Sequence, residues 1–485
     1  MLLLVAIAAA APDDDLGRAA ATQVVLNEGL DAFSGLAPES DARAAFILGS
    51  CGGRGPMIEG LLAAACGRGR GVSWQVRPTF GLELGDGSGD NATGDAAPGW
   101  FGPRLGARAA LYSGPMVLRA SPRIGLDAIP GVSPSLSMSE LWIGYDRGKG
   151  WIGVGTQDRW MGPGHHGTLL LSNNAMAPWM LNGGIDGHLP GMLGVIGRFR
   201  AEAGVGFLTE PRRDVDNPGL LMMDFRWLPH PVLEIGVNRL AMFGGEGRPD
   251  VDIGQLLVPS EPHVYDDPDK TLPDQNELAT VNFRVNAPLH RWFGGPLGHL
   301  AGWWEYGGED MILRDLGTIK YPSLAGVGNL YGGELAIGPV VLTGEYSRLM
   351  DDYYRWYVGH RVYHDGFTQN GRVLGHFGGP DSETTWAQVA IWGERWRVRA
   401  SGDMVRRVGV IEASNDAIFT LPTEEVRLRG SVGADGLWRD AWWSASYSLA
   451  NVVGEDFIPG NDGIEHRFVL GVDLASGWGS APSQP

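Results

Sequence analysis

The sequence is poor in cysteine, in positive charge and in long apolar segments, and each shortage excludes a class of protein. Its two cysteines, Cys51 and Cys66, have a spacing that matches no zinc-binding or Cys-x-x-Cys redox motif. Lys and Arg number 38 against 56 Asp and Glu, and the net charge of −18 argues against a nucleic-acid partner, which binds through cationic side chains. Beyond the N-terminus, no uncharged apolar run reaches the roughly 18 residues that a membrane-spanning helix requires.

The N-terminal segment MLLLVAIAAAAPDDD has the apolar centre and small-residue end of an export signal, although it lacks the usual basic start. We therefore expect residues 1–11 to be a signal peptide. In the oxidising compartment that export implies, a disulfide between Cys51 and Cys66 would stabilise the fold by roughly 3 kcal/mol, while two unpaired buried thiols also fit. An exported chain without a spanning helix is either soluble outside the inner membrane or a β-barrel.

Glycine and tryptophan are abundant, at 75 and 18 residues, and only 19% of residues are charged, which is typical of many short strands and tight turns. Residues 12–72 are alanine-rich and predict a small helical region. From about Ser73 onward the pattern has a period of two. In TVNFRVN, for example, Val281, Phe283 and Val285 face one way and the polar residues between them face the other.

Two features favour a membrane barrel over a soluble β-sandwich or propeller, which the alternation alone also fits. The polar face often carries arginines and acids, as in RVRASGD at 397–403, which is expected for a water-filled or plugged lumen. Tryptophans and tyrosines cluster near strand ends, as at Trp303-Trp304, where a membrane barrel has its aromatic girdles. At roughly 22 residues for each strand with its turn, residues 73–485 supply about 16–18 strands.

Three segments are rich in Gly, Pro, Asp, Asn and His and predict long loops: residues 159–193, 242–278 and 350–384. Loops of this length are usually functional, and outer-membrane barrels place them outside or fold them inward. The first begins RWMGPGHHGTLLLSNNAMAPW and carries most of the candidate binding residues.

That first stretch resembles a signature of the capsule assembly protein Wzi family, in which Trp-Gly-Pro-Gly leads into Leu-Ser-Asn-Asn-Ala. FGGEGRP at 243–249 resembles the family's Gly-Gly-Glu-Gly-Arg-Pro segment. Weaker likenesses are EYGGEDMI at Glu305, KYPSLAGV at Lys320 and NGRVLGHFGGPDSE at Asn370. The resemblance spans roughly Leu141 to the last strand, and Met161 and Phe243 depart from it, since tryptophans are expected there.

The resemblance implies a mainly β chain: a transmembrane outer-membrane β-barrel of about 18 antiparallel strands with a small N-terminal periplasmic helical region. It also implies a non-enzymatic lectin that retains exported capsular or exopolysaccharide at the cell surface. Polysaccharide and outer-membrane lipid are then the expected partners, with no nucleic acid and no cofactor. The alternatives are a passive channel and a barrel-embedded hydrolase that uses His364, Asp365 and Ser382, although no G-x-S-x-G, H-E-x-x-H or P-loop motif is present.

Sugars stack their C–H faces on aromatic rings, and their hydroxyls suit amides, which both donate and accept hydrogen bonds. The candidate polysaccharide-binding residues are Asp158, Arg159, Trp160, His165, Asn173, Asn174, Trp179, Glu246 and Arg248. A structural role is the alternative, with the asparagines buttressing a loop folded into the barrel and Glu246 paired with Arg248 in the lumen. We predict no metal site, because the adjacent His165 and His166 diverge and lack a third ligand at a recognisable offset.

Overall fold

A computed structural model describes residues 72–85, 101–125, 135–147, 149–188, 196–249, 251, 275–315, 320–350, 355–358, 360, 362–393, 396–413, 417–438, 441–474 and 478–479. Most of these residues lie in β-strands, and nearly all of the strands belong to one continuous antiparallel sheet.

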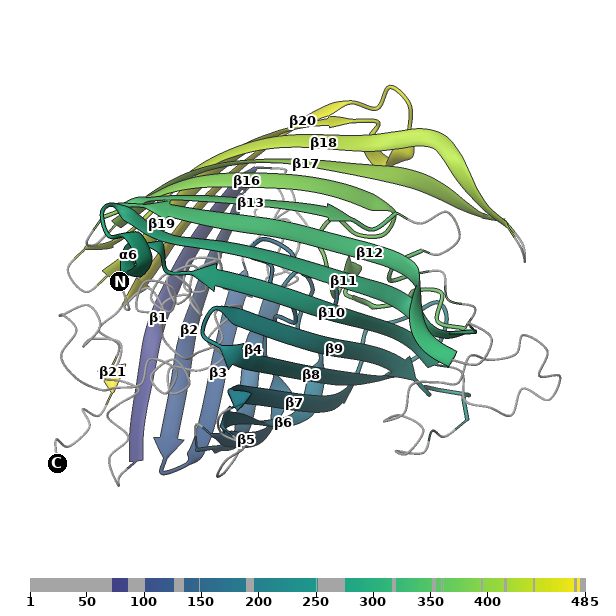
Figure 1. The fold of residues 1–485 in the computed structure, drawn as a ribbon. Coiled ribbons are helices and arrows are strands. Elements are labelled where there is room, and N and C mark those ends of the chain that lie inside the picture. Colours follow the sequence, from purple (N-terminus) through teal and green to yellow (C-terminus); the bar gives the residue numbers. More distant parts are fainter. Residues whose placement is uncertain are drawn as a thin grey trace.

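Eighteen strands of the described part close into a barrel (Figure 1). Each pairs with the next along the chain, and β20 closes the ring by pairing with β1. The barrel strands are β1 (Val72–Gly85), β2 (Phe101–Ser113), β3 (Met116–Gly125), β4 (Ser135–Asp146), β5 (Gly150–Thr156), β6 (Trp179–His188), β7 (Arg198–Phe207), β8 (Gly219–His230), β9 (Leu233–Phe243), β10 (Gln275–Ala287), β11 (Leu297–Asp315), β12 (Lys320–Ile337), β13 (Val340–Arg348), β16 (Ser382–Trp392), β17 (Trp396–Ala413), β18 (Ala417–Trp438), β19 (Ala441–Val453) and β20 (Gly463–Leu474). The short β21 (Trp478–Gly479) lies beside β1, and β14 (Thr368–Gln369) with β15 (Arg372–Val373) forms a separate hairpin.

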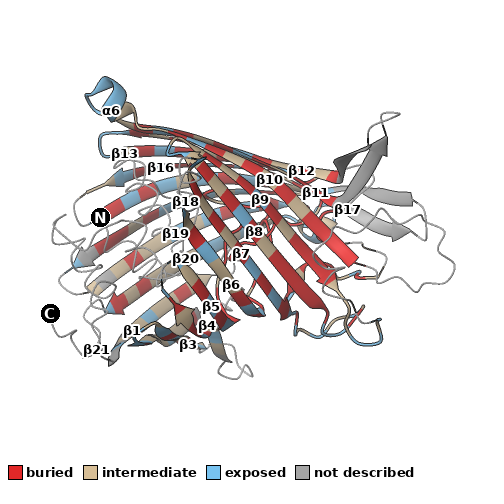
Figure 2. Cartoon of the chain, turned by 60° about the horizontal axis from the view of Figure 1, so that its bottom comes forward, coloured by how far each residue is buried: buried red, intermediate tan, exposed pale blue. Residues whose placement is uncertain are grey.

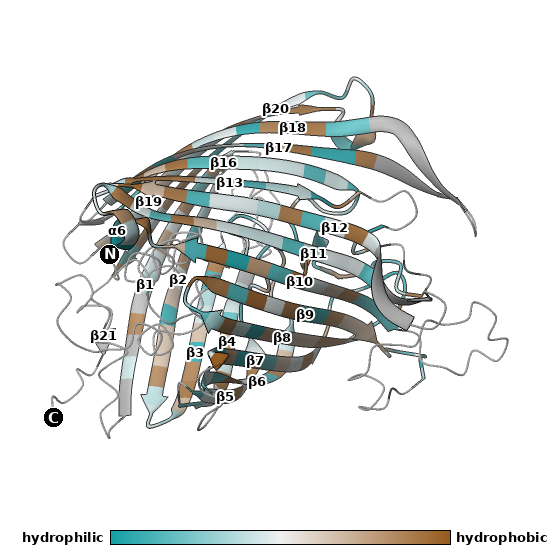
Figure 3. Cartoon of the chain, viewed as in Figure 1, coloured by the Kyte–Doolittle hydropathy of each residue, from teal (hydrophilic) through white to brown (hydrophobic). Residues whose placement is uncertain are grey.

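Side chains alternate between the lumen and the outer surface because successive residues of a strand point to opposite faces. In β16, Trp386 is 3% exposed, whereas Val389 and Ile391 are 45% and 42% exposed. Figure 2 shows this alternation of burial on many strands, and Figure 3 shows the matching alternation of hydropathy on β8, β9 and β10. Because the exposed side chains are mostly aliphatic or aromatic and the buried ones are often polar, the apolar face is the outer one, as in a membrane barrel.

The connections at the two ends of the barrel differ in length. At one end two residues suffice to join β2 to β3, β8 to β9 and β12 to β13. This end also carries the short helix α6 (Leu289–Phe293) between β10 and β11. Outer-membrane barrels have short turns in the periplasm and long loops outside, which assigns the opposite end, with its longer connections, to the cell exterior. No helix among the described residues has the length and apolarity to cross a bilayer.

The largest apolar core lies inside the barrel, where two segments fold inward from the exterior end. The plug loop, residues 157–178, connects β5 to β6, and the second plug segment, described at 355–358, 360 and 362–381, lies between β13 and β16. Leu170 and Trp356 from these segments pack in one cluster with Leu240 and Leu330 of the barrel wall, and all four side chains are fully buried. The part of the lumen bounded by β6 to β12 is therefore filled with protein.

The predicted mainly β fold of about 18 antiparallel strands is confirmed, and the soluble sandwich and propeller alternatives are wrong. Two of the predicted long loops, 159–193 and 350–384, largely coincide with the plug loop and the second plug segment, although β6 occupies part of the first and β16 begins at the end of the second. The predicted signal peptide, the helical region and the Cys51–Cys66 pair precede β1 and lie outside the described residues, so they stay predictions.

Candidate functional site

A buried carboxylate from the barrel wall holds the tip of the plug loop. Glu345 of β13 accepts the backbone amides of three consecutive residues, His165, His166 and Gly167, the last two at 2.9 Å. Trp303 of β11 donates its indole N–H to the same carboxylate at 3.0 Å. A carboxylate removed from water needs hydrogen bonds to its charge, and these donors supply them. The loop is thus docked through its backbone.

Glu305 of β11 holds the residues that follow. Its carboxylate accepts the amide of Leu169 at 3.1 Å and the hydroxyl of Thr168 at 3.2 Å. Arg284 of β10 provides the opposite kind of contact, because its guanidinium donates to the carbonyl of Pro163 at 2.9 Å. Charged side chains of the wall therefore match both the donors and the acceptors of a loop that has no regular secondary structure of its own.

Hydrogen bonds join the plug loop to the second plug segment. The amide of Ser172 donates to the carbonyl of Leu374 at 2.8 Å. The side-chain amide of Asn174 donates to the carbonyl of Val373 at 3.0 Å. Since both partners belong to the second plug segment, the two inward-folded pieces form a single plug.

The two adjacent histidines pack as aromatic rings. The ring of His166 stacks on Trp386 at 4.4 Å between centroids and meets Phe377 edge-on at 4.7 Å. His165 lies on the same tryptophan at 5.8 Å. In the part of the chain that the structure describes, no group of three or more His, Cys, Asp or Glu side chains is placed to hold a metal ion.

Most of the predicted binding residues are buried in the plug. Arg159, Trp160, His165, Asn173 and Asn174 are each 4–6% exposed. Arg159 forms an ion pair with a lumen-facing glutamate of β7, at 3.2 Å, and Trp160 donates its indole N–H to a backbone carbonyl at 3.0 Å. The sequence offered the buttressing role as an alternative for the two asparagines, and the hydrogen bond from Asn174 to Val373 fits that role.

Two predicted residues near the plug are placed differently. Asp158 is only partly buried, in the first turn of the plug loop. Trp179 begins β6 and is 47% exposed on the outer surface, where its strand neighbour Phe207 is 55% exposed. An aromatic side chain at that place faces lipid rather than the lumen, so Trp179 does not join the other candidates.

Glu246 and Arg248 lie outside the lumen, in the loop after β9. Glu246 is exposed and accepts a hydrogen bond from the side-chain amide of Asn217 at 3.0 Å. No ion pair joins Glu246 to Arg248, which are both among the described residues, so the ion-paired alternative is not formed and contact with the ligand stays a prediction. Gly244, Gly245 and Gly247 adopt positive φ, which permits the tight turn that carries Glu246 and Arg248.

We call residues 208–218 and 244–249, together with residues 363–372 of the second plug segment, the rim, because these segments are joined to one another at the exterior end. Arg213, with 89% of its side chain exposed, donates to the carboxylate of Asp365 at 2.5 and 2.8 Å. Arg212 is buried and donates to Asp214 at 2.9 Å and to the carbonyl of Gly366 at 2.8 Å. One face of this network holds the loops together, and the other is open to solvent.

Two rim carboxylates, those of Asp214 and Asp365, are held in their ionised form. Burial raises the pKa of Asp214, but the Arg212 guanidinium and the backbone amides of Val215 and Asp365 outweigh it, so the pKa lies below its ordinary value. Burial also raises the pKa of Asp365, but the hydrogen bonds from Arg213 outweigh this effect, so the pKa lies below its ordinary value. Asp214 and Asp365 therefore keep their negative charge at neutral and mildly acidic pH.

The hydrolase alternative finds no assembled site. His364 is exposed, and Asp365 is engaged by Arg213. Ser382 is fully buried and donates its hydroxyl hydrogen to the carbonyl of Gly379 at 2.8 Å. Acid–base activation of a serine requires the base within hydrogen-bond reach, and the structure does not bring these three candidates together.

A family model described as capsule assembly protein Wzi matches residues 103–452, which is most of the barrel. The chain belongs to the capsule assembly protein Wzi family. Family and fold together make this Wzi-family chain an outer-membrane protein. No curated protein sequence matches it.

Among solved structures, the chain is similar to Wzi of Escherichia coli, described as an outer-membrane, carbohydrate-binding β-barrel involved in group 1 capsule assembly. The TM-score is 0.68 at 17% identity, over 94% of this chain and 97% of that one. Pseudomonas aeruginosa OprD matches with a TM-score of 0.46 at 8% identity, over 84% of this chain and 94% of that one. Acinetobacter baumannii OccAB2 gives 0.48 at 10% identity, over 84% and 98%.

The sequence analysis missed Glu345 as the residue that docks the plug, and noticed Glu305 only within a family likeness. Both lie in strands whose alternation is ordinary, so nothing marks them locally. One signal was available: each is an acid on the face that an alternating strand turns to the lumen. The rim residues Arg213 and Asn217 were missed because they stand in a short connection without a motif.

Proposed function

We propose that this Wzi-family protein binds exported capsular or exopolysaccharide at the cell surface and helps to retain it there, and that the polymer contacts the rim. The observation that carries the proposal is the placement of exposed polar groups at the exterior end, directly joined to a plug that fills the lumen beneath them. Family membership supports the polysaccharide as the ligand.

The chemistry of the rim suits a neutral or mildly charged sugar chain. Arg213 presents a planar set of donors, Glu246 presents acceptors, and Asn217 presents both. Vicinal hydroxyls of a sugar bind such groups in pairs, and because Arg213 and Asn217 already contact Asp365 and Glu246, their orientation is fixed before the polymer arrives.

The buried candidates take a supporting role in this proposal. A polymer outside the cell meets the rim first, whereas Trp160, Asn173 and Asn174 are covered by the plug that they help to shape. Their substitution should act on polymer binding only by altering the plug. Glu246 and Arg248 stay candidates for direct contact.

The test measures the ratio of cell-attached to released polysaccharide at unchanged total output. Deletion of the gene should lower the attached fraction and raise the released one. In the deletion strain, Arg213→Ala combined with Glu246→Ala should restore less attachment than the wild-type gene, although the protein reaches the membrane in equal amount. Arg147→Ala is the matched control, because Arg147 is exposed near the short-turn end and should leave attachment unchanged.

An unchanged ratio after gene deletion would refute polysaccharide retention itself. Normal attachment by the double variant would instead move the contact away from the rim. Unboiled protein should migrate faster than boiled protein on a detergent gel for every variant, which separates a binding defect from a folding defect.

A further inference from the structure

The outer wall carries a row of polar side chains where lipid-facing residues are expected. The row consists of Asn329 of β12, Arg348 of β13, Glu383 of β16 and Arg406 of β17. Each pairs directly with the next across neighbouring strands. Arg348 is the last residue of β13, on the exterior side, and the strand alternation turns its side chain outward. Charges on the lipid face are costly near mid-membrane and cheap near the interface, so the row marks the headgroup level of the outer leaflet.

The two acidic groups of this region are already engaged. Glu383 accepts a hydrogen bond from the hydroxyl of Tyr346 and an ion pair from Arg406 at 3.4 Å. Arg406 also donates to Glu424 through its Nε at 2.9 Å. Arg348, in contrast, forms no ion pair with any residue that the structure describes. A cation therefore stands at the lipid interface with its carboxylate neighbours directed elsewhere.

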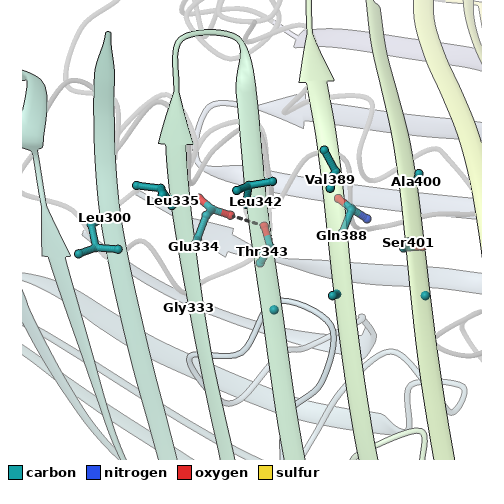
Figure 4. Close-up of a pocket in the computed structure, with 13 residues that line it drawn as sticks. Leu300, Gly333, Glu334, Leu335, Leu342, Thr343, Gln388, Val389, Ala400 and Ser401 are labelled. Carbon is teal, nitrogen blue, oxygen red and sulfur yellow. Dashed lines mark hydrogen bonds between the residues drawn. The ribbon is translucent and has the colours of Figure 1, made fainter. Parts of the chain in front are cut away.

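An apolar groove of about 610 Å³ lies on the same strands, nearer to their short-turn ends than the polar row. Figure 4 shows the residues that line it. Its lining consists mainly of outward-facing positions on β11, β12, β13, β16 and β17. Leu300, Leu342 and Val389 form its exposed aliphatic wall, at 47%, 41% and 45% exposure, and Gly344 lies in its floor. Gly344 and Arg348 are four residues apart on one face of β13, about 13 Å along the strand.

The backbone does not require glycine at the floor of the groove. A Cβ on Gly344 would find only one atom, a backbone oxygen at 3.7 Å, and one on Gly333 only an oxygen at 3.5 Å, both ordinary contacts. Neither glycine has a positive φ. Glycine inside a strand is destabilising and often marks a close approach from outside. The groove is continuous with the surface that meets the membrane, so its neighbours there are lipid chains.

We propose that β12, β13, β16 and β17 form a binding site for a phosphorylated, acylated glycolipid of the outer leaflet. Arg348 receives a phosphate group, while Arg406, two strands away, holds the intervening Glu383 carboxylate, and one acyl chain lies in the groove above Gly344. The separation of about 13 Å between cation and groove floor suits one molecule, because an acyl chain reaches from the interface toward the membrane centre. This site lies on the lipid side of the wall and is independent of polysaccharide binding at the rim.

The experiment uses the full-length protein in nanodiscs of phosphatidylethanolamine and lipopolysaccharide, followed by release in mild detergent and native mass spectrometry. Wild-type protein should retain lipopolysaccharide. Arg348→Gln should reduce retention about fivefold, from the loss of one cation at a lipid interface. Gly344→Leu, which fills the groove without a backbone clash, should reduce it by a similar factor.

Two matched variants test the location. Lys149→Gln removes one positive charge near the short turn between β4 and β5, and Val154→Leu enlarges an outward residue on β5, away from the groove. Both should retain lipopolysaccharide as the wild type does. If Arg348→Gln and Gly344→Leu retain as much lipopolysaccharide as the wild type, the site is overturned. Retention of phosphatidylethanolamine alone, or a dimer mass without lipid, would overturn the ligand and point to another occupant of the groove.

Discussion

The plug loop and the rim differ in an instructive way. The plug loop has the conspicuous sequence motif, whereas the rim has the exposed polar side chains. The plug loop holds the tryptophan, histidines and asparagines that first suggest binding, yet its candidates Arg159 to Asn174 are almost wholly buried. The rim connection 208–218 has no motif, yet it presents Arg213 with 89% of its side chain in solvent. A conspicuous composition here follows from packing an irregular loop inside a barrel, and contact with the outside falls to plainer residues.

The largest effect is expected from Glu345→Ala. The substitution leaves the amides of His165, His166 and Gly167 without their acceptor in a buried place, at about 1–3 kcal/mol for each. We expect a lower unfolding temperature and a rise in single-channel conductance in planar bilayers. Glu345→Gln keeps one acceptor oxygen, so its unfolding temperature and conductance should lie between those of the wild type and Glu345→Ala. If Glu345→Ala has the conductance and the unfolding temperature of the wild type, the plug is held by other contacts.

Trp356→Ala tests whether the core of the plug matters as much as its hydrogen bonds. Trp356 is fully buried among Leu330, Leu349 and Tyr357, and removal of such a side chain costs about 3–5 kcal/mol. Thermal unfolding followed by gel mobility should register the loss. Trp292→Ala is the control: this tryptophan of α6 is 55% exposed, and its removal should hardly change the unfolding temperature.

Arg213→Ala sharpens the comparison from the opposite side. An exposed ion pair contributes little to folding, so unfolding should shift by well under about 1 kcal/mol. Polysaccharide attachment should nevertheless decrease, because the rim loses its most exposed donor. A large loss of stability without a loss of attachment would reverse the roles that we assign to rim and plug.

The smallest effect concerns acid. The lowered pKa values of Asp214 and Asp365 mean that their ion pairs stabilise the rim fully above the ordinary aspartate pKa of about 3.9. This contribution is lost as the pH falls through the lower folded-state values. Protection factors for the amides in 209–217 and 363–371, which divide out the intrinsic pH dependence of exchange, should therefore be equal at pH 7 and pH 5 and lower near pH 3. Asp214→Asn should abolish much of that difference.

The alternating strands made the barrel predictable, because a period of two over several hundred residues leaves few other folds. Two of the three predicted long loops include the segments that fold inward, but the sequence indicated neither which loops enter the lumen nor what holds them there. Glu345 and Gly167 are 178 residues apart, and a contact at that separation leaves no trace in local periodicity. The exposure of the candidate side chains could not be predicted from the sequence either. Whether Asn173 faces a polymer or a carbonyl depends on the wall that surrounds it. The position of Glu246 depends on the turn at Gly244.

The docking of the plug on Glu345 also has a consequence for how the chain assembles. The amides of residues 165–167 find their acceptor only when β13 takes its place in the ring, and β13 lies far along the sequence from β5 and β6. Closing a loop of that size costs entropy before any hydrogen bond compensates for it, so the contact forms late. Until β13 is in place, the amides of residues 165–167 lack the carboxylate that accepts them. The plug loop can therefore dock on Glu345 only when β13 is correctly placed in the wall, so docking depends on a complete barrel.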